Sequence, residues 1–203
     1  MVERLVVGIT GASGIAYGLR ILEVLKSGPI ETHLVMSKAA EATLATESER
    51  KVADVHALAH VVHPVGDLGA AIASGSFATL GMVVAPCSIR TLAEIATGVT
   101  TTLLSRAADV ALKERRRLVL MVRETPLHTG HLRTMTQASE MGAVIFPPVP
   151  AFYGWPASIA DIVDQTCGRV LDLFGIGNDL VRRWGEPAID GQRAVRAFPR
   201  RGT

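Results

Sequence analysis

The stretch Val6-Val7-Gly8-Ile9-Thr10-Gly11-Ala12-Ser13-Gly14 joins an apolar segment to a turn of glycine and serine. A helical pattern follows it, with apolar side chains at Leu19, Ile21, Leu22 and Leu25. A strand, a tight turn and a helix in this order direct backbone N–H groups and a helix N-terminus at one point, which suits a phosphate group. The glycine spacing matches neither G-x-G-x-x-G nor a P-loop, so an ordinary turn that needs small residues for close packing is the alternative.

Short apolar segments alternate with helical patterns along the rest of the chain. We expect strands at 4–9, 32–36, 80–85, 118–122 and 143–146. We expect helices at 15–26, 38–46, 88–97, 101–114, 131–141 and 159–173. This alternation predicts an α/β fold with a mostly parallel sheet covered on both faces, which is a three-layer αβα arrangement. No repeat or linker divides it, so we expect one domain over 1–187 and a tail, 188–203, that is flexible or an oligomer arm.

The composition excludes several classes of protein. Of 203 residues 48% are hydrophobic but only 4% are aromatic. A chain this apolar has more apolar surface than a monomer can bury, which predicts a homo-oligomer. No uncharged apolar run reaches the length of a membrane span. A net charge of +2 is too small to indicate nucleic acid. Cys87 and Cys167 are isolated and lack metal spacing, which fits a reducing cytoplasm.

Polar and charged residues gather where the expected strands end, which is where ligands bind in parallel sheets. These ends are 10–14, Ser37-Lys38, Pro86-Cys87-Ser88, Arg123-Glu124 and 150–153. Arg123 suits an anionic oxygen and Glu124 can exchange a proton, although a charged pair closing a strand is the plainer interpretation. Ser88 with Thr91 is also a normal helix cap.

Other candidate residues have equally plain alternatives. Glu47 follows a helix of alanine and threonine and has no evident basic partner, so an exposed helix-end acid is as good an interpretation. Arg106, Lys113 and Arg169 lie on expected helices, where surface charge is common. The histidine pairs lack a carboxylate and a third ligand, so we predict no metal. Cys87 has no base tied to it by spacing, which favours a buried thiol.

With these residues in view, the chain resembles the UbiX-type flavin prenyltransferases, formerly described as aromatic-acid or polyprenyl-hydroxybenzoate decarboxylases. The resemblance runs from Gly8 to about Trp184 and is specific because so many motifs occur together. The motifs are Thr10-Gly11-Ala12-Ser13-Gly14, Ser37-Lys38, Ala73-Ser74-Gly75-Ser76, Pro86-Cys87-Ser88 with Thr91, Arg106-Ala107-Ala108-Asp109 through Lys113-Glu114-Arg115, Arg123-Glu124-Thr125-Pro126 and Pro150-Ala151-Phe152-Tyr153.

The resemblance implies a flavodoxin-like or Rossmann-like domain that binds FMN, without a metal, in a homododecamer with active sites between subunits. It implies transfer of a dimethylallyl group from dimethylallyl monophosphate to N5 and C6 of reduced FMN, for use by a UbiD-type decarboxylase. The residues alone leave open whether the donor is a monophosphate or a pyrophosphate.

The resemblance also implies roles for individual residues. FMN is held by Gly11, Ala12, Ser13, Ser37, Ser88, Ile89, Arg90, Thr91 and Arg123. The prenyl phosphate is held by Arg106, Lys113, Arg123, Tyr153 and Arg169, and Trp184 borders the prenyl group. Catalytic roles fall to Ser13, Glu47, Glu124 and Lys113, with the two glutamates as the acids of the reaction. Clustered cations then replace the metal that pyrophosphate enzymes use when the leaving group departs.

Three alternatives are weaker. The turn is similar to that of nicotinamide oxidoreductases, but no Tyr-x-x-x-Lys follows, because Ile21 and Ala157 stand four residues after Tyr17 and Tyr153. A non-catalytic FMN carrier shares the fold but does not need the glutamates and the cations. A related flavin-dependent decarboxylase of cysteine-derived substrates uses a histidine near the N-terminus and lacks the Arg-Glu-Thr-Pro motif.

Overall fold

The computed structural model describes residues 2–185 of the chain. The chain divides into two compact units, with the boundary between Pro148 and Val149. The single domain over 1–187 stays a prediction, and the expected tail at 188–203 lies outside the described residues.

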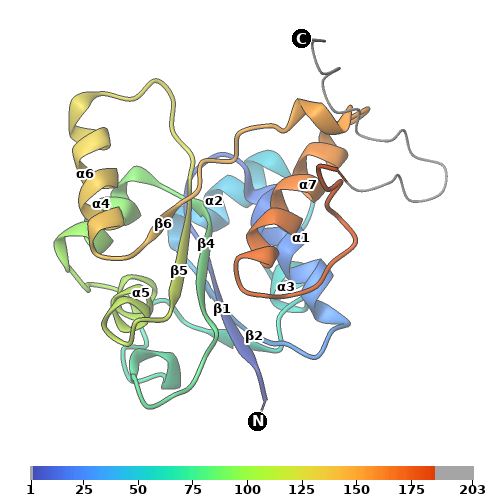
Figure 1. Cartoon of the computed structure of the whole chain (residues 1–203). Helices are drawn as coiled ribbons and strands as arrows, with labels where there is room; N and C mark the ends of the chain where they lie inside the picture. The colour runs from blue at the N-terminus through green and yellow to red at the C-terminus, as the bar shows by residue number, and fades with distance from the viewer. Residues whose placement is uncertain (1, 186–203) are drawn as a thin grey trace. The chain divides into compact units, whose positions relative to one another are not determined.

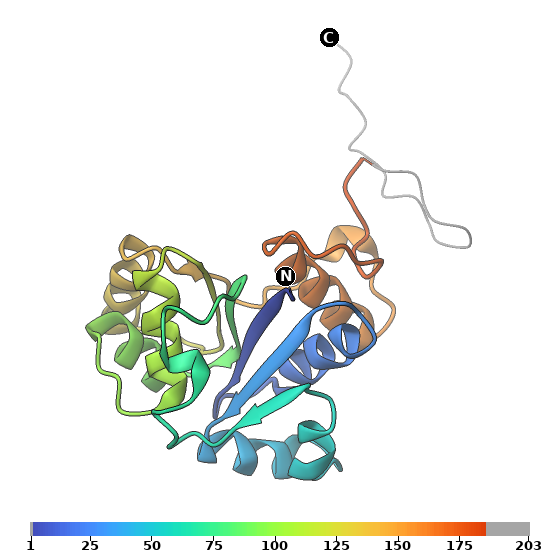
Figure 2. The same cartoon turned by 90° about the horizontal axis from the view of Figure 1, so that it is seen from below.

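The first unit is built on a six-stranded sheet in the order β3-β2-β1-β4-β5-β6, in which every pairing is parallel. The strands are β1 (Arg4–Ile9), β2 (Glu31–Met36), β3 (Val61–His63), β4 (Gly81–Cys87), β5 (Arg117–Val122) and β6 (Val144–Ile145). Figure 2 shows β1, β2 and β3, dark blue to cyan, lying side by side. The strand order reverses between β1 and β4, so their carboxyl ends flank the position at which such sheets bind ligands.

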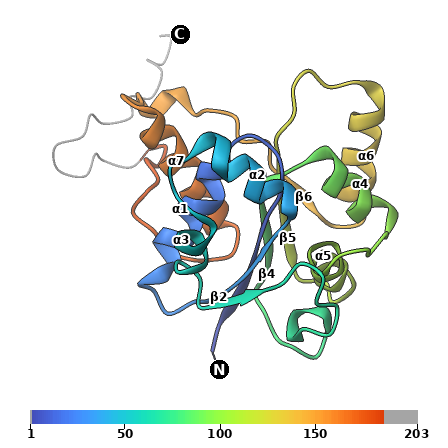
Figure 3. The same cartoon turned by 180° about the vertical axis from the view of Figure 1, so that it is seen from behind.

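Helices cover both faces of this sheet. They are α1 (Ile15–Lys26), α2 (Lys38–Glu47), α3 (Val52–His56), α4 (Ile89–Thr97), α5 (Leu103–Lys113) and α6 (Thr129–Glu140), with a 3-10 turn, η1, at Ala71–Ala73. Helix α1 packs against β1, β2 and β4, while α4 and α5 lie on the opposite face and α6 packs on α4 (Figures 1 and 3). This arrangement confirms the predicted αβα fold.

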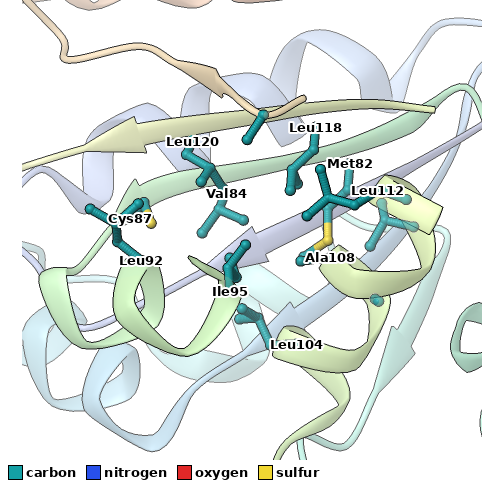
Figure 4. Close-up of a cluster of buried hydrophobic side chains, with 14 of the residues drawn as sticks. Met82, Val84, Cys87, Leu92, Ile95, Leu104, Ala108, Leu112, Leu118 and Leu120 are labelled. Carbon is teal, nitrogen blue, oxygen red and sulfur yellow. The ribbon is translucent and has the colours of Figure 1, made fainter. Parts of the chain in front are cut away.

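Alternating strand residues form the core beneath α4 and α5. Met82 and Val84 from β4 and Leu118 and Leu120 from β5 are fully buried and point toward these helices (Figure 4). From the helices, the side chains that pack against them are those of Leu92, Ile95, Leu104, Ala108 and Leu112. Cys87 is part of this cluster, and burial raises the pKa of its thiol. The buried thiol expected from the sequence is confirmed.

The second unit consists of a 3-10 turn, η2 (Phe152–Gly154), helix α7 (Ile159–Asp172) and the segment that follows to 185. Ser158 and Asp161 form a reciprocal capping box that fixes the start of α7. A side chain at Gly168 would come within 2.5 Å of both Asn178 and Val181. The glycine therefore lets the segment after the helix pack directly on α7.

Two elements of the first unit were missed in the polar stretch 48–70, namely α3 and β3. Helix α3 has five residues and β3 has three, with Val62 exposed, so neither carries a clear period. Strand β4 reaches Cys87 rather than stopping at Ala85, and β6 is only two residues long. None of the helices in the described part of the chain is long and apolar enough to cross a membrane.

Candidate active site

The turn after β1 holds a carboxylate. Gly14 adopts φ +102°, a left-handed conformation that favours glycine, and stands at the N-terminus of α1. Glu47, the last residue of α2, accepts hydrogen bonds there from the N–H groups of Gly14 at 2.9 Å and Ile15 at 3.0 Å. The donors that the sequence offered to a phosphate at this helix are thus bonded to Glu47. Glu47 is an exposed acid at the end of its helix, as the plainer interpretation had it, but its carboxylate is bonded to the neighbouring turn.

Glu47 is ionised at neutral pH. Burial raises the pKa of its carboxyl, but the Ser13 hydroxyl, the two backbone N–H groups and the charge of Arg123 together lower it below the usual range. Ser13 bonds Glu47, and the charge of Arg123 acts on the same carboxylate, so residues of three separate segments act together here. We call this group the turn cluster.

Thr10 joins the ends of β1 and β4. Its side chain is buried, donates to the carbonyl oxygen of Pro86 at 2.7 Å and accepts from the N–H of Ser88 at 2.8 Å. This buried threonine was not singled out as a site residue, although a threonine that ends an apolar strand directly before the glycine turn was the available signal. The two hydrogen bonds of Thr10 hold the turn at Ser88 in position next to the turn at Ser13.

Two further helices begin at the same edge of the sheet. The Ser37 hydroxyl caps α2 by accepting from the N–H of Ala40, and the Ser88 hydroxyl caps α4 by accepting from the N–H of Thr91. A helix N-terminus presents more backbone donors than one cap satisfies, so both ends suit an anion. A side chain at Gly11 would come within 2.3 Å of the Ala39 side chain, so glycine is what lets the turn approach α2.

The predicted residues at the α4 turn do not all face the same way. Ile89 is the first residue of α4, and the exposed side chain of Arg90 bonds Glu94 on its own helix at 3.0 Å. Arg90 can therefore reach a ligand through its backbone N–H rather than through its guanidinium, which is engaged on the helix surface. Ala12 lies in the first turn, where its N–H donates to the carbonyl oxygen of Thr10.

Arg123 and Glu124 follow β5 at the same edge. The N–H of Arg123 donates to the carbonyl oxygen of Cys87 at 3.0 Å, which aligns the end of β5 with that of β4. Arg123 is half-buried, whereas Glu124 is exposed and accepts from the N–H of Thr125 at 2.9 Å. Arg123 thus stands where its charge acts on Glu47, which bonds Ser13, and Glu124 is next in the chain.

Arg106 and Lys113 lie elsewhere in the same unit. Lys113 ends α5 just before β5 begins, so it stands at the amino edge of the sheet, roughly 20 Å from Arg123 for a strand of six residues. There it pairs with Glu114 beside the Gly75 loop. Arg106 bonds the carbonyl oxygen of Ala73 at 3.2 Å and Asp109 at 2.7 Å. One chain does not bring these two cations to the turn cluster.

The second unit holds the remaining predicted residues. The ring of Trp184 meets that of Tyr153 edge to face, with the ring centres 5.5 Å apart. Arg169 on α7 bonds Asp172 at 2.8 Å, and Arg183 bonds the same carboxylate at 2.9 and 3.0 Å. The hydrogen bond from Arg183, with the one from Arg169, lowers the pKa of Asp172 against an opposing effect of burial.

Gln165 of α7 was missed. It is buried, and its amide lies 3.2 Å from the Tyr153 hydroxyl. A polar amide among the buried positions of an otherwise apolar helix face was the signal that could have identified it.

The edge formed by the first unit suits a phosphorylated ligand. It presents the N-termini of α2 and α4, the guanidinium of Arg123 and an ionised carboxylate that can accept a proton. Among the described residues, no group of three or more histidine, cysteine, aspartate or glutamate side chains could hold a metal ion.

Comparison with known proteins identifies relatives over nearly the whole chain. The family model described as Flavoprotein matches residues 2–171. The chain is 60% identical over 185 residues to the flavin prenyltransferase UbiX of Escherichia coli strain K12, covering 90% of this chain and 98% of that protein.

Solved structures agree with this similarity. The crystal structure of AnUbiX (PadA1) in complex with FMN and dimethylallyl pyrophosphate matches with a TM-score of 0.90 and 51% identity, covering 92% of this chain and 99% of that one. A dodecameric FMN-dependent UbiX-like decarboxylase from Escherichia coli O157:H7 matches with a TM-score of 0.88 and 49% identity, covering 91% and 100%.

Proposed function

The chain belongs to the UbiX flavin prenyltransferases of the Flavoprotein family, and on that premise we propose that it joins a dimethylallyl group to reduced FMN. The donor is dimethylallyl monophosphate, and the new bonds are made to flavin N5 and C6. The observation that carries this proposal is the turn cluster, in which Ser13, an ionised Glu47 and Arg123 meet at the ligand-binding edge of the sheet.

FMN fits the donors at that edge. The backbone of Gly11 and Ser13 and the N-termini of α2 and α4 supply N–H groups, Ala12 lies between them in the turn, and Arg123 supplies a charge for a phosphate. The remaining residues proposed to hold FMN are Ser37, Ser88, Ile89, Arg90 and Thr91. The relative solved with FMN supports this assignment. Reduced FMN supplies the electron-rich atoms that accept the prenyl group.

Fixed cations and a phenol assist departure of the phosphate. When the allylic C1–O bond breaks, the phosphate leaves with the electron pair, and positive groups already in place stabilise that charge. The resemblance to the prenyltransferases assigns Arg123, Tyr153 and Arg169 to the prenyl phosphate and Trp184 to the border of the prenyl group. Lys113 and Arg106 reach the site from neighbouring copies, because within one chain they lie away from the turn cluster.

The two glutamates take different roles in proton transfer. The lowered pKa of Glu47 keeps it ionised, and an ionised carboxylate can take up the protons displaced from the flavin. Glu124 is exposed next to Arg123 and can give a proton to the leaving phosphate. Ser13 bonds Glu47 and can relay protons to it.

The assembly is a homododecamer, which a dodecameric relative supports. The product, prenylated FMN, is the cofactor of a UbiD-type decarboxylase. The two buried thiols, Cys87 and Cys167, fit a reducing cytoplasm.

Mass spectrometry of released flavin tests the reaction. The protein is incubated anaerobically with reduced FMN and dimethylallyl monophosphate, and the flavin mass is compared with that from reactions lacking the donor. We expect a gain of one C5H8 unit together with release of inorganic phosphate. Dimethylallyl pyrophosphate, supplied in parallel, identifies the preferred donor. Unmodified flavin with both donors contradicts the proposal.

A further inference from the structure

Gln165 holds three groups of the second unit at once. Its side chain is 7% exposed and lies in the middle of α7. The N–H of Arg182 donates to Oε1 at 2.8 Å, Nε2 donates to the Tyr153 hydroxyl oxygen at 3.2 Å, and Nε2 also lies 3.4 Å from the Arg182 carbonyl oxygen. The amide is therefore bonded at both ends in a buried place.

The contact with Arg182 fixes which end of the amide faces Tyr153. A backbone N–H can only donate, so the atom 2.8 Å from it must be the carbonyl oxygen of Gln165. The NH2 end is then turned toward the phenol, and toward the Arg182 carbonyl, which can only accept. Both backbone contacts select the same orientation.

This orientation decides how Tyr153 can bond. A phenol has one proton to donate and an oxygen that accepts. Because Nε2 of Gln165 has no lone pair to accept that proton, the Tyr153 oxygen is the acceptor in their bond, and its own proton is left to donate elsewhere.

Other neighbours of Tyr153 also fix the position of its ring. Trp184 packs edge to face against it, and the Arg182 guanidinium donates to the carbonyl oxygen of Gly154, the next residue. Gln165 and Arg169 stand four residues apart on α7, so they are neighbours on its surface. The phenol is thus fixed one helical turn from a proposed phosphate-binding cation.

We propose that Gln165 is a positioning residue that makes Tyr153 a hydrogen-bond donor to the phosphate of the prenyl donor. The inference rests on the proposed function, which places Tyr153 at that phosphate. Gln165 itself touches neither substrate. Because it donates to the Tyr153 hydroxyl, that hydroxyl does not donate its own proton to Gln165.

The test replaces the side chain at position 165, which donates to Tyr153, with one that accepts from it. In Gln165→Glu the carboxylate still accepts from the N–H of Arg182 but also accepts the Tyr153 proton, which withdraws it from the phosphate. A hydrogen bond to a charged group is lost, so we expect kcat/KM for dimethylallyl monophosphate to fall roughly tenfold or more, with most of the change in KM. The Kd for FMN stays unchanged. Gln137→Glu, the same change at an exposed position of α6, is the matched control.

The Tyr153→Phe background separates positioning from structure. Without the phenol there is no proton to direct, so Gln165→Glu has no further effect on KM if the inference holds. If Gln165→Glu raises KM equally in the parent and in Tyr153→Phe, the inference is overturned, because the role of Gln165 is then structural. An unchanged KM in Gln165→Glu also overturns it when Tyr153→Phe alone raises KM. Should Tyr153→Phe itself leave KM unchanged, the proposed function has misplaced Tyr153, whatever Gln165 does.

Folding is followed separately by thermal unfolding. If Gln165→Glu does not fold, Gln165→Met takes its place, because it removes the donor at similar volume. The freed phenol can then rotate, so we expect roughly a threefold rise in KM that again vanishes in Tyr153→Phe. A rise that persists there overturns the inference.

Discussion

At the scale of single residues, Glu47 shows how a charged side chain can replace a ligand at a helix end. The N-terminus of α1 carries partial positive charge, and Glu47 is the anion bonded there in the protein. Its carboxylate thereby belongs both to the fold and to the turn cluster with Ser13 and Arg123. Changes at Glu47 should therefore affect stability as well as activity.

We predict that Glu47→Gln lowers the free energy of unfolding by about 0.5–1 kcal/mol at pH 7, a value discounted for solvent screening. The pKa of Glu47 is lowered from 4.5 in the fold, so its ionised form stabilises the protein above that pH. This stability is lost as the pH falls below 4.5 and through the folded pKa. Urea unfolding at a series of pH values measures it.

The difference in the free energy of unfolding between the parent and Glu47→Gln should be largest at pH 7 and should shrink as the pH falls toward 3. Glu49→Gln, two residues further on and exposed, is the matched control and should change stability by less than about 0.5 kcal/mol. A difference that widens on acidification contradicts the assigned direction of the pKa shift.

At the scale of elements, the carboxyl ends of β1 and β4 are tied by a buried side chain rather than by the sheet alone. The pairing of these two strands ends at Gly8 and Val84. Beyond this point the Thr10 hydroxyl bridges Pro86 and Ser88. With the backbone N–H of Thr10, which also donates to the Pro86 carbonyl oxygen, that hydroxyl holds the two ligand-binding turns in position.

Thr10→Val should lower the free energy of unfolding by about 1 kcal/mol, because it leaves the partly buried N–H of Ser88 without its acceptor. Thr10→Ser keeps the hydroxyl and should lose less. Chemical denaturation of both variants, with FMN titrations at a fixed temperature, measures the effect. Equal stability of the valine and serine variants would show that the hydroxyl does not carry the bridge.

The elements differ in how well the sequence predicts them. Strand β1 and helix α1 were predicted with their bounds, because Val6, Val7 and Ile9 are followed by a glycine turn and a regular apolar stripe. Strand β3 was missed because it is a three-residue edge strand with little burial, held by pairing to β2. Pairing is a tertiary contact and leaves no local period.

The site was predictable in part for the same physical reason. Ser37, Ser88 and Arg123 directly follow strands, so the parallel sheet brings them to one edge without any further information. The bonds from Glu47 to the α1 N-terminus and the orientation of the Gln165 amide arise from packing between distant segments. Neither leaves a motif in the chain.

At the scale of the whole molecule, the position of Lys113 determines how many chains a complete site needs. Helix α5 carries the chain back from the carboxyl edge to the amino edge of the sheet, so its last residue, Lys113, lies roughly a strand length from Arg123. A lysine side chain does not span that distance. If Lys113 assists the phosphate, it must do so in the site of another copy.

Mixing two inactive variants tests this arrangement. Lys113→Ala and Glu124→Gln should each slow prenyl transfer severely as pure proteins while retaining FMN. In a particle reassembled from equal amounts, a site that takes Glu124 from one chain and Lys113 from a neighbour is intact in about a quarter of cases by random assortment. We therefore expect about a quarter of the parent activity, measured as prenylated flavin formed per minute. Each pure variant carried through the same reassembly is the control. If both residues served the site of their own chain, no mixed particle would contain an intact site, and the mixture would be no more active than the controls.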